Sequence, residues 1–195
     1  MSWIDLSHTI ADGMAQYPGD YPPPRLVRRL TFAEGGHLVT ALDLGCHVGT
    51  HIDTPLHFLA GQPGLEALPL DRFAGSALCL DAPAGEIGED VLRGVDLAGT
   101  DFVLLRTGWE RHWGTPRYYD RWPTVSPALA RRLAGARLKG VGLDTPSSDP
   151  LNGRVAHDLF AAAGLINIEN LAYLAALPRG PFEFLVLPLK LAGTE

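Results

Sequence analysis

Short apolar segments separated by Gly- and Pro-rich turns run through this chain, and from residue 76 onward two kinds of segment alternate. Alternating or continuous apolar runs predict strands, whereas helical spacing behind a capping residue predicts helices. We expect strands at 76–82, 101–107, 139–144 and 165–168, and helices at 89–94, 126–134 and 155–163. Ser126 can cap the second helix, with Pro127 in its first turn and Gly135 after its end. This rhythm is typical of an α/β protein.

The first part of the chain is less regular. β-Branched and apolar residues predict a short strand at 3–10, and Gly, Pro-Gly and acidic residues predict a loop at 13–20. We expect an edge strand at 26–31, a strand at 38–44 and irregular chain at 65–75. Near the C-terminus, residues 182–188 predict a buried strand.

Three of the chain's seven histidines and one aspartate fall within eleven residues after the strand expected at 38–44. A regular helix through this run is disfavoured by Gly49 and Pro55, so we expect a tight, irregular turn. Imidazole and carboxylate groups are the ligands that zinc or manganese takes from proteins. A single histidine is usually a surface or core residue, so it is the spacing of the four together that predicts a metal site: His47, His51, Asp53 and His57.

Two further candidates lie later in the chain. His157 falls in the first turn of the helix expected at 155–163, and Glu169 follows twelve residues later. Each alone is more often an exposed residue. Between them and the first motif, five aromatic residues crowd the stretch from Trp109 to Trp122. They predict either an aromatic wall beside an active site or a satellite hydrophobic cluster under a long loop.

Composition narrows the function classes. The 195 residues predict one domain, 1–195, with an ordinary globular balance of 46% hydrophobic and 19% charged residues. A net charge of −6 without a basic block argues against nucleic-acid partners and acidic membrane surfaces. The first residues do not resemble a signal peptide, which predicts a cytoplasmic protein. Two cysteines, Cys46 and Cys79, form neither a disulfide framework nor a thiolate metal site.

Four motifs resemble those of the metal-dependent cyclase/kynurenine formamidase family, one of them with a departure. The run 47–57 matches H-x-G-T-H-x-D-x-P-x-H at every fixed position, and 142–150 matches G-x-D-x-x-S-x-D-P. His157 precedes a Gly-to-Ile-Glu-Asn-Leu run at 164–171, as in the family. The family's G-M-x-x-W-P-G-D run is matched at 13–20 by Gly13, Met14, Pro18, Gly19 and Asp20, but Tyr17 replaces the Trp that touches the substrate in the family.

The resemblance implies a mixed-sheet α/β fold of the swivelling β/α type. It assigns His47 and His51 to a first metal ion, His157 to a second, and Asp53 and Glu169 to both. Five ligands are too many for one open zinc site and suit two zinc ions, although manganese or a single ion would also be compatible. It also implies that His57 donates and accepts protons, that Tyr17 binds the substrate, and that the chain forms a homodimer or larger assembly.

The implied reaction is the hydrolysis of a small-molecule amide. Compact bacterial members of the family convert N-formyl-L-kynurenine to L-kynurenine and formate in tryptophan catabolism. The Tyr17 replacement favours an alternative, the same chemistry on a cyclic, isatin-like amide. A third possibility is a non-catalytic metal-binding protein, against which stand the surplus carboxylates and the unassigned His57.

Overall fold

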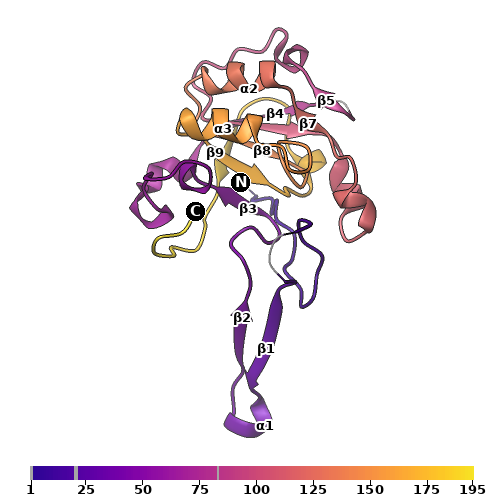
Figure 1. Ribbon diagram of the computed structural model, residues 1–195, viewed down its shortest axis with the longest axis vertical. Coiled ribbons are helices and arrows are strands. Elements are labelled where there is room, and N and C mark those ends of the chain that lie inside the picture. Colours follow the sequence, from indigo (N-terminus) through magenta and orange to yellow (C-terminus); the bar gives the residue numbers. More distant parts are fainter. Residues whose placement is uncertain (1, 20–21, 83) are drawn as a thin grey trace.

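A six-stranded mixed sheet forms the body of the protein, as the computed structural model shows for residues 2–19, 22–82 and 84–195 (Figure 1). The strand order is β10-β4-β6-β8-β9-β3, in which the four inner strands are parallel and the two edge strands antiparallel. This architecture confirms the α/β prediction. The strands of this sheet are β3 (His51–Asp53), β4 (Ala74–Asp81), β6 (Phe102–Arg106), β8 (Gly140–Leu143), β9 (Ile166–Glu169) and β10 (Phe182–Leu185).

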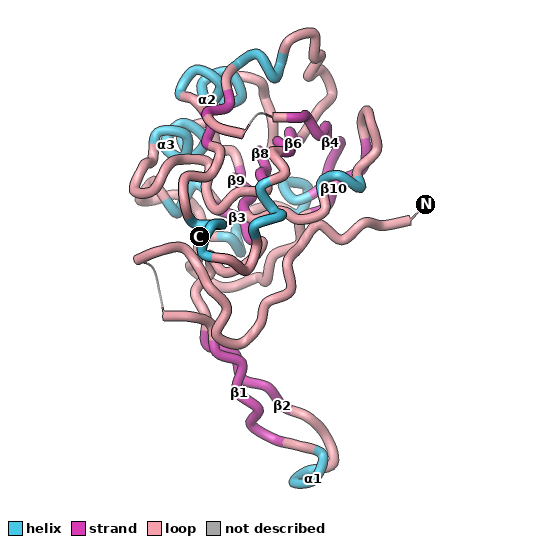
Figure 2. The backbone as a smooth tube through the Cα atoms, turned by 90° about the vertical axis from the view of Figure 1, so that its right-hand side faces the viewer, coloured by secondary structure: helices cyan, strands magenta, loops and turns pink. Residues whose placement is uncertain are grey.

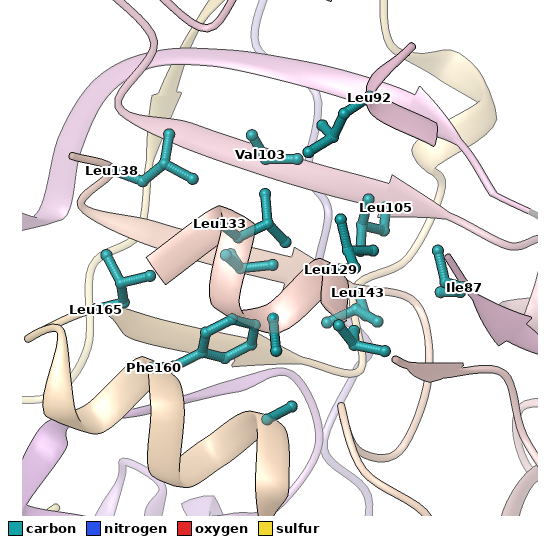
Figure 3. Close-up of a cluster of buried hydrophobic side chains, with 14 residues drawn as sticks. Ile87, Leu92, Val103, Leu105, Leu129, Leu133, Leu138, Leu143, Phe160 and Leu165 are labelled. Carbon is teal, nitrogen blue, oxygen red and sulfur yellow. The ribbon is translucent and has the colours of Figure 1, made fainter. Parts of the chain in front are cut away.

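Two α-helices cover one face of the sheet, α2 (Pro127–Ala134) and α3 (Val155–Ala162). Figure 3 shows Leu129 and Leu133 of α2 and Phe160 of α3 pointing toward the side chains of the inner strands. All of these helix residues are at most 1% exposed. The parallel strands are therefore buried and read as continuous apolar runs, which is why the sequence predicted them well.

The opposite face is covered by turns and loops instead of α-helices. Phe102, Leu104 and Ile168 on this face pack against side chains such as Phe73 and Leu174 from 3₁₀ turns. The 3₁₀ segments are Pro55–His57, Leu65–Ala67, Leu70–Phe73, Glu89–Leu92, Trp109–His112, Pro116–Tyr119 and Leu174–Ala176. The helix expected at 89–94 is one of these 3₁₀ segments. The strand before it, β5 (Glu86–Ile87), pairs in parallel with β7 (Thr124–Val125).

A β-hairpin projects from the body (Figures 1 and 2). It pairs β1 (Arg25–Leu30) with β2 (Val39–Asp43) in antiparallel register, and the short helix α1 (Phe32–Gly35) forms its tip. Both strands were predicted, within one or two residues at each end. Phe32 and Leu42 on this hairpin are 66% and 61% exposed.

Three further predicted elements differ from the structure. Residues 3–10 form no strand; they make isolated hydrogen bonds, such as that from the His8 amide to Thr50 Oγ1, which cannot build a ladder. The buried strand expected at 182–188 ends at Leu185 in the structure. It is the edge strand β10, in which only Phe184 is buried. The turn expected at 46–58 contains the strand β3 and a 3₁₀ turn, and only Gly49 in it has a left-handed φ, of 66°. Asp20 lies outside the described residues.

Within the described residues, no helix combines the length and the apolar character that crossing a lipid bilayer requires.

Ser126 caps α2, as predicted: its Oγ accepts a hydrogen bond from the Leu129 amide at 3.2 Å. We expect Ser126→Ala to lower the free energy of unfolding by about 1 kcal/mol, because this amide then loses its partner. Ser126→Thr keeps the oxygen and serves as control. Urea denaturation checks the pair, and equal loss in both variants would contradict the capping role.

Candidate metal centre

The site begins with the pairing of β3 and β9. His51 lies opposite Glu169 and Asp53 opposite Asn167, so these four side chains share one face of the sheet. Ile52 and Ile168, between them, point to the opposite face and join the apolar core there. Asp53, Asn167 and Glu169 are only 3%, 2% and 5% exposed. The pairing therefore holds two carboxylates and an amide next to each other in a buried place.

Asp53 divides the site into two halves. Its Oδ1 lies 2.8 Å from His47 Nδ1 and 3.3 Å from His51 Nε2. Its Oδ2 lies 3.4 Å from His157 Nε2 and 3.0 Å from Asn167 Nδ2. One carboxylate thus faces His47 and His51 on one side and His157 on the other.

Glu169 spans the same two halves. Its Oε2 lies 3.7 Å from His51 Nε2, whereas its Oε1 lies 3.0 Å from His157 Nε2. Oε1 also accepts hydrogen bonds from Asn167 Nδ2 at 2.8 Å and from the Ser148 amide at 3.1 Å. The structure therefore brings all five predicted ligands together around Asp53 and Glu169.

The Nδ1 atoms of His51 and His157 each lie within hydrogen-bond distance of an acceptor oxygen. His51 Nδ1 lies 2.9 Å from the Gly49 carbonyl oxygen, and His157 Nδ1 lies 2.6 Å from Asp149 Oδ2. An Nδ1 that donates to such an acceptor leaves Nε2 to bind a metal ion, and these acceptors also fix the orientation of the ring. In both residues Nε2 is the atom that faces the carboxylates.

The carboxylates and histidines shift one another's pKa values. Burial lowers the pKa of His47, but its hydrogen bond to Asp53 and the charges of Asp53, Glu169 and Glu195 raise it to about 9. Burial raises the pKa of Asp53, but hydrogen bonds from His157, His47 and His51 hold it well below 3.8. Asp53 is thus ionised and is balanced by the protonated imidazole of His47, whose proton a bound cation would displace.

Two groups of side chains have ligand atoms close enough to hold one ion each: His47, Asp53 and His57, and His51, Asp53 and Glu169. Nitrogen and carboxylate oxygen donors of this kind suit a borderline divalent cation such as zinc. The donor set therefore fits a metal ion. His57, which the resemblance assigns to proton transfer, also lies within ligand distance in one of these groups.

A cavity of about 250 Å³ opens onto this cluster and is lined by His57, Tyr17, Tyr119 and Phe58 as well as the ligand candidates. His57 is exposed and packs its ring against that of His47, with centroids 4.0 Å apart. The Tyr17 hydroxyl accepts a hydrogen bond from the Asn152 amide at 3.3 Å. A larger cavity of about 550 Å³ has a mostly apolar lining without Asp53, His57 or Glu169, so the smaller one is the candidate site.

The aromatic stretch from Trp109 to Trp122 is a packed cluster. Trp109, Tyr118 and Trp122 are at most 5% exposed, and both indole nitrogens donate to backbone carbonyls. Of the two interpretations, the hydrophobic cluster describes these three residues. Tyr119 is the member of this stretch that lines the site cavity.

Four residues at the site were not predicted as site residues. Asp149 and Asn170 stand inside the matched motifs, so their signal was available. Asn167 precedes Glu169 by two residues in a strand, a spacing that places both on one face. Glu195, whose Oε1 is 3.3 Å from His47 Nε2, carried no local signal because 148 residues separate the two in sequence.

Comparisons with known proteins find relatives over the full length of the chain. Residues 4–150 match the model of a protein family described as "Putative cyclase". The chain is 33% identical over 204 residues to a kynurenine formamidase of Salinibacter ruber, covering 100% of this chain and 93% of that protein. It is 32% identical to a kynurenine formamidase of Bacillus mycoides, covering 99% and 92%.

Solved structures show the same fold. A predicted metal-dependent hydrolase from Bacillus stearothermophilus superposes with a TM-score of 0.80 at 30% identity, over 98% of this chain and 92% of that one. Isatin hydrolase A from Labrenzia aggregata superposes with a TM-score of 0.87 at 22% identity, over 98% and 88%. The second likeness shows the fold alone.

Asp149 links α3 to the site. Its two carboxylate oxygens accept hydrogen bonds from the Ala156 and His157 amides, each at 3.0 Å, and one of them also contacts His157 Nδ1. We expect Asp149→Ala to lower the free energy of unfolding by about 2–4 kcal/mol, because it leaves two buried amides at a helix start without partners. Urea denaturation measures this loss.

The matched control is Asp158→Ala on the same helix. Asp158 pairs with Arg154 at the surface, and such exposed pairs contribute about 0–1 kcal/mol. A loss as large in Asp158→Ala as in Asp149→Ala would contradict the role of the buried cap.

Proposed function

Because this chain belongs to the cyclase family, we propose that it is a metal-dependent amide hydrolase that converts N-formyl-L-kynurenine to L-kynurenine and formate. The observation that supports this most is the convergence of His47, His51, Asp53 and Glu169 beside His57 at one cavity. The full-length similarity to kynurenine formamidases supports the substrate. In this proposal the chain is a hydrolytic enzyme and not a non-catalytic metal-binding protein.

Zinc is the proposed ion, with manganese as the second candidate. His47, His51, Asp53 and Glu169 would hold it by nitrogen and oxygen atoms. When bound, such an ion lowers the pKa of water and polarises a carbonyl group, which are the two requirements of amide hydrolysis.

His57 is the proposed proton carrier. Although the residue is exposed at the cavity mouth, the partial burial of its ring beside His47 and Phe58 lowers its pKa from the ordinary 6.5, so the imidazole is neutral at pH 7 and can take a proton. The backbone amide of His57 donates to the Thr54 carbonyl at 3.0 Å, which fixes the start of the side chain at the cavity wall. His57 would accept a proton from the attacking water and deliver it to the amide nitrogen that leaves.

Tyr17 would contact the aromatic ring of the substrate. It packs edge-on against Trp122, with centroids 5.8 Å apart, and Tyr119 is its neighbour in the cavity lining. Two aromatic side chains suit an aryl amide. They also suit a cyclic, isatin-like amide, so turnover has to be measured with both substrates. The cytoplasmic location and the homodimer or larger assembly stay predictions.

Metal removal tests the reaction. We expect protein stripped by a chelator to lose turnover of N-formyl-L-kynurenine and to regain it with added zinc or manganese, because the ligands remain in place. Released kynurenine is followed by its absorbance. Metal-bound protein that leaves N-formyl-L-kynurenine intact but opens isatin would contradict the proposed substrate and keep the proposed chemistry.

His57→Ala tests the proton carrier. We expect zinc content to stay at the wild-type level and kcat to fall about 10²–10⁴-fold, the usual effect of a general acid–base residue. His37→Ala is the matched control, since His37 is an exposed histidine near the tip of the hairpin. Loss of zinc from the His57 variant would instead make His57 a ligand.

A further inference from the structure

The side chain of Asn167 lies in one half of the site. In the half with His157, three candidate ligand atoms surround the Asn167 amide nitrogen: Glu169 Oε1 at 2.8 Å, Asp53 Oδ2 at 3.0 Å and His157 Nε2 at 3.1 Å. No hydrogen bond joins an Asn or Gln amide to His47 or His51 Nε2 among the described residues. In the part of the chain that the structure describes, a side-chain amide thus engages the candidate ligand atoms of this half only.

Asn167 is held in this orientation. Its Oδ1 accepts a hydrogen bond from Ser148 Oγ at 2.7 Å, and both residues are at most 2% exposed. The two amide hydrogens match the two carboxylates that face them. Turning the amide over would place Oδ1 within 3.0 Å of two carboxylate oxygens, which repel it.

Asn167 and His157 converge on the same two carboxylate oxygens. Glu169 Oε1 and Asp53 Oδ2 accept the two amide hydrogens of Asn167. His157 Nε2 lies 3.0 Å from the first oxygen and 3.4 Å from the second. The two oxygens that a second ion would need are therefore already engaged by groups of the protein.

We propose that the Asn167 carboxamide takes the place of a second metal ion, so that the chain holds one divalent ion, in the half that contains His47 and His51. This inference rests on the proposed function for the presence of a metal site. It revises the expectation of two zinc ions. His157 is then a positioning residue: through Nε2 it contacts Glu169 Oε1 and Asp53 Oδ2 and orients the two carboxylates.

Zinc stoichiometry tests the proposal. The full chain is stripped, loaded with excess zinc and desalted, and zinc per chain is measured by plasma mass spectrometry. We expect one ion in the wild type and two in Asn167→Val, which removes the donor and keeps a residue suited to a strand. In Asn167→Val combined with His157→Ala we expect one ion again, which would place the additional ion at His157.

Two controls accompany the variants. Ile168→Val changes the opposite face of the same strand and should keep one ion. His157→Ala in the wild-type background should also keep one ion. Circular dichroism and thermal melting confirm folding, and zinc should raise the melting temperature of Asn167→Val more than that of the wild type, since it fills two places. If Asn167→Val does not fold, Asn167→Ser replaces it with the same expected count.

The outcomes separate the two proposals. Two ions in the wild type, one ion in folded Asn167→Val, or loss of the ion in His157→Ala would each overturn the role of Asn167. No zinc in the wild type would overturn the metal site itself. One ion without turnover of any amide would leave the stoichiometry standing and overturn the proposed function.

Discussion

The antiparallel register of β3 against β9 is the constraint on which the site depends. It places His51 opposite Glu169 and Asp53 opposite Asn167, while Ile52 and Ile168 face the core. Because side chains alternate along a strand, a slip by one residue would bury the carboxylates in the apolar layer and expose the isoleucines to the cavity. Packing of the core therefore fixes the geometry of the chemistry.

Two buried carboxylates at this register need positive charge or hydrogen-bond donors around them. The structure meets this need differently on the two sides of Asp53. On one side are His47 and His51, whose ring nitrogens can bind a cation. On the other side an uncharged amide and His157 fill the same role without an ion. The two buried carboxylates can thus be stabilised either by hydrogen-bond donors of the protein or by a bound cation.

The histidines are held by segments far from the motif that contains most of them. Asp149 caps α3 and contacts His157, so the helix start and the ligand are positioned by one carboxylate. Asn170 donates to the Gly49 carbonyl, and Tyr118 of the aromatic cluster donates to Asn170. The aromatic cluster thereby supports the turn before His51 although its tryptophans are buried away from the cavity. Substitutions in that cluster act on the site through packing.

The sequence by itself determined the alternating strands and helices of the sheet, the cap at Ser126 and the density of ligands at 47–57, because these depend on neighbours in the chain. It did not determine the strand β3, which is only three residues long and exists because β9 lies beside it. Nor could it assign Asn167, whose spacing from Glu169 gives the shared face but not the partners. Only the tertiary structure brought Asp53 and His157 together beside that amide, since the contact between Asp53 and Asn167, which are 114 positions apart, follows from packing of the whole sheet.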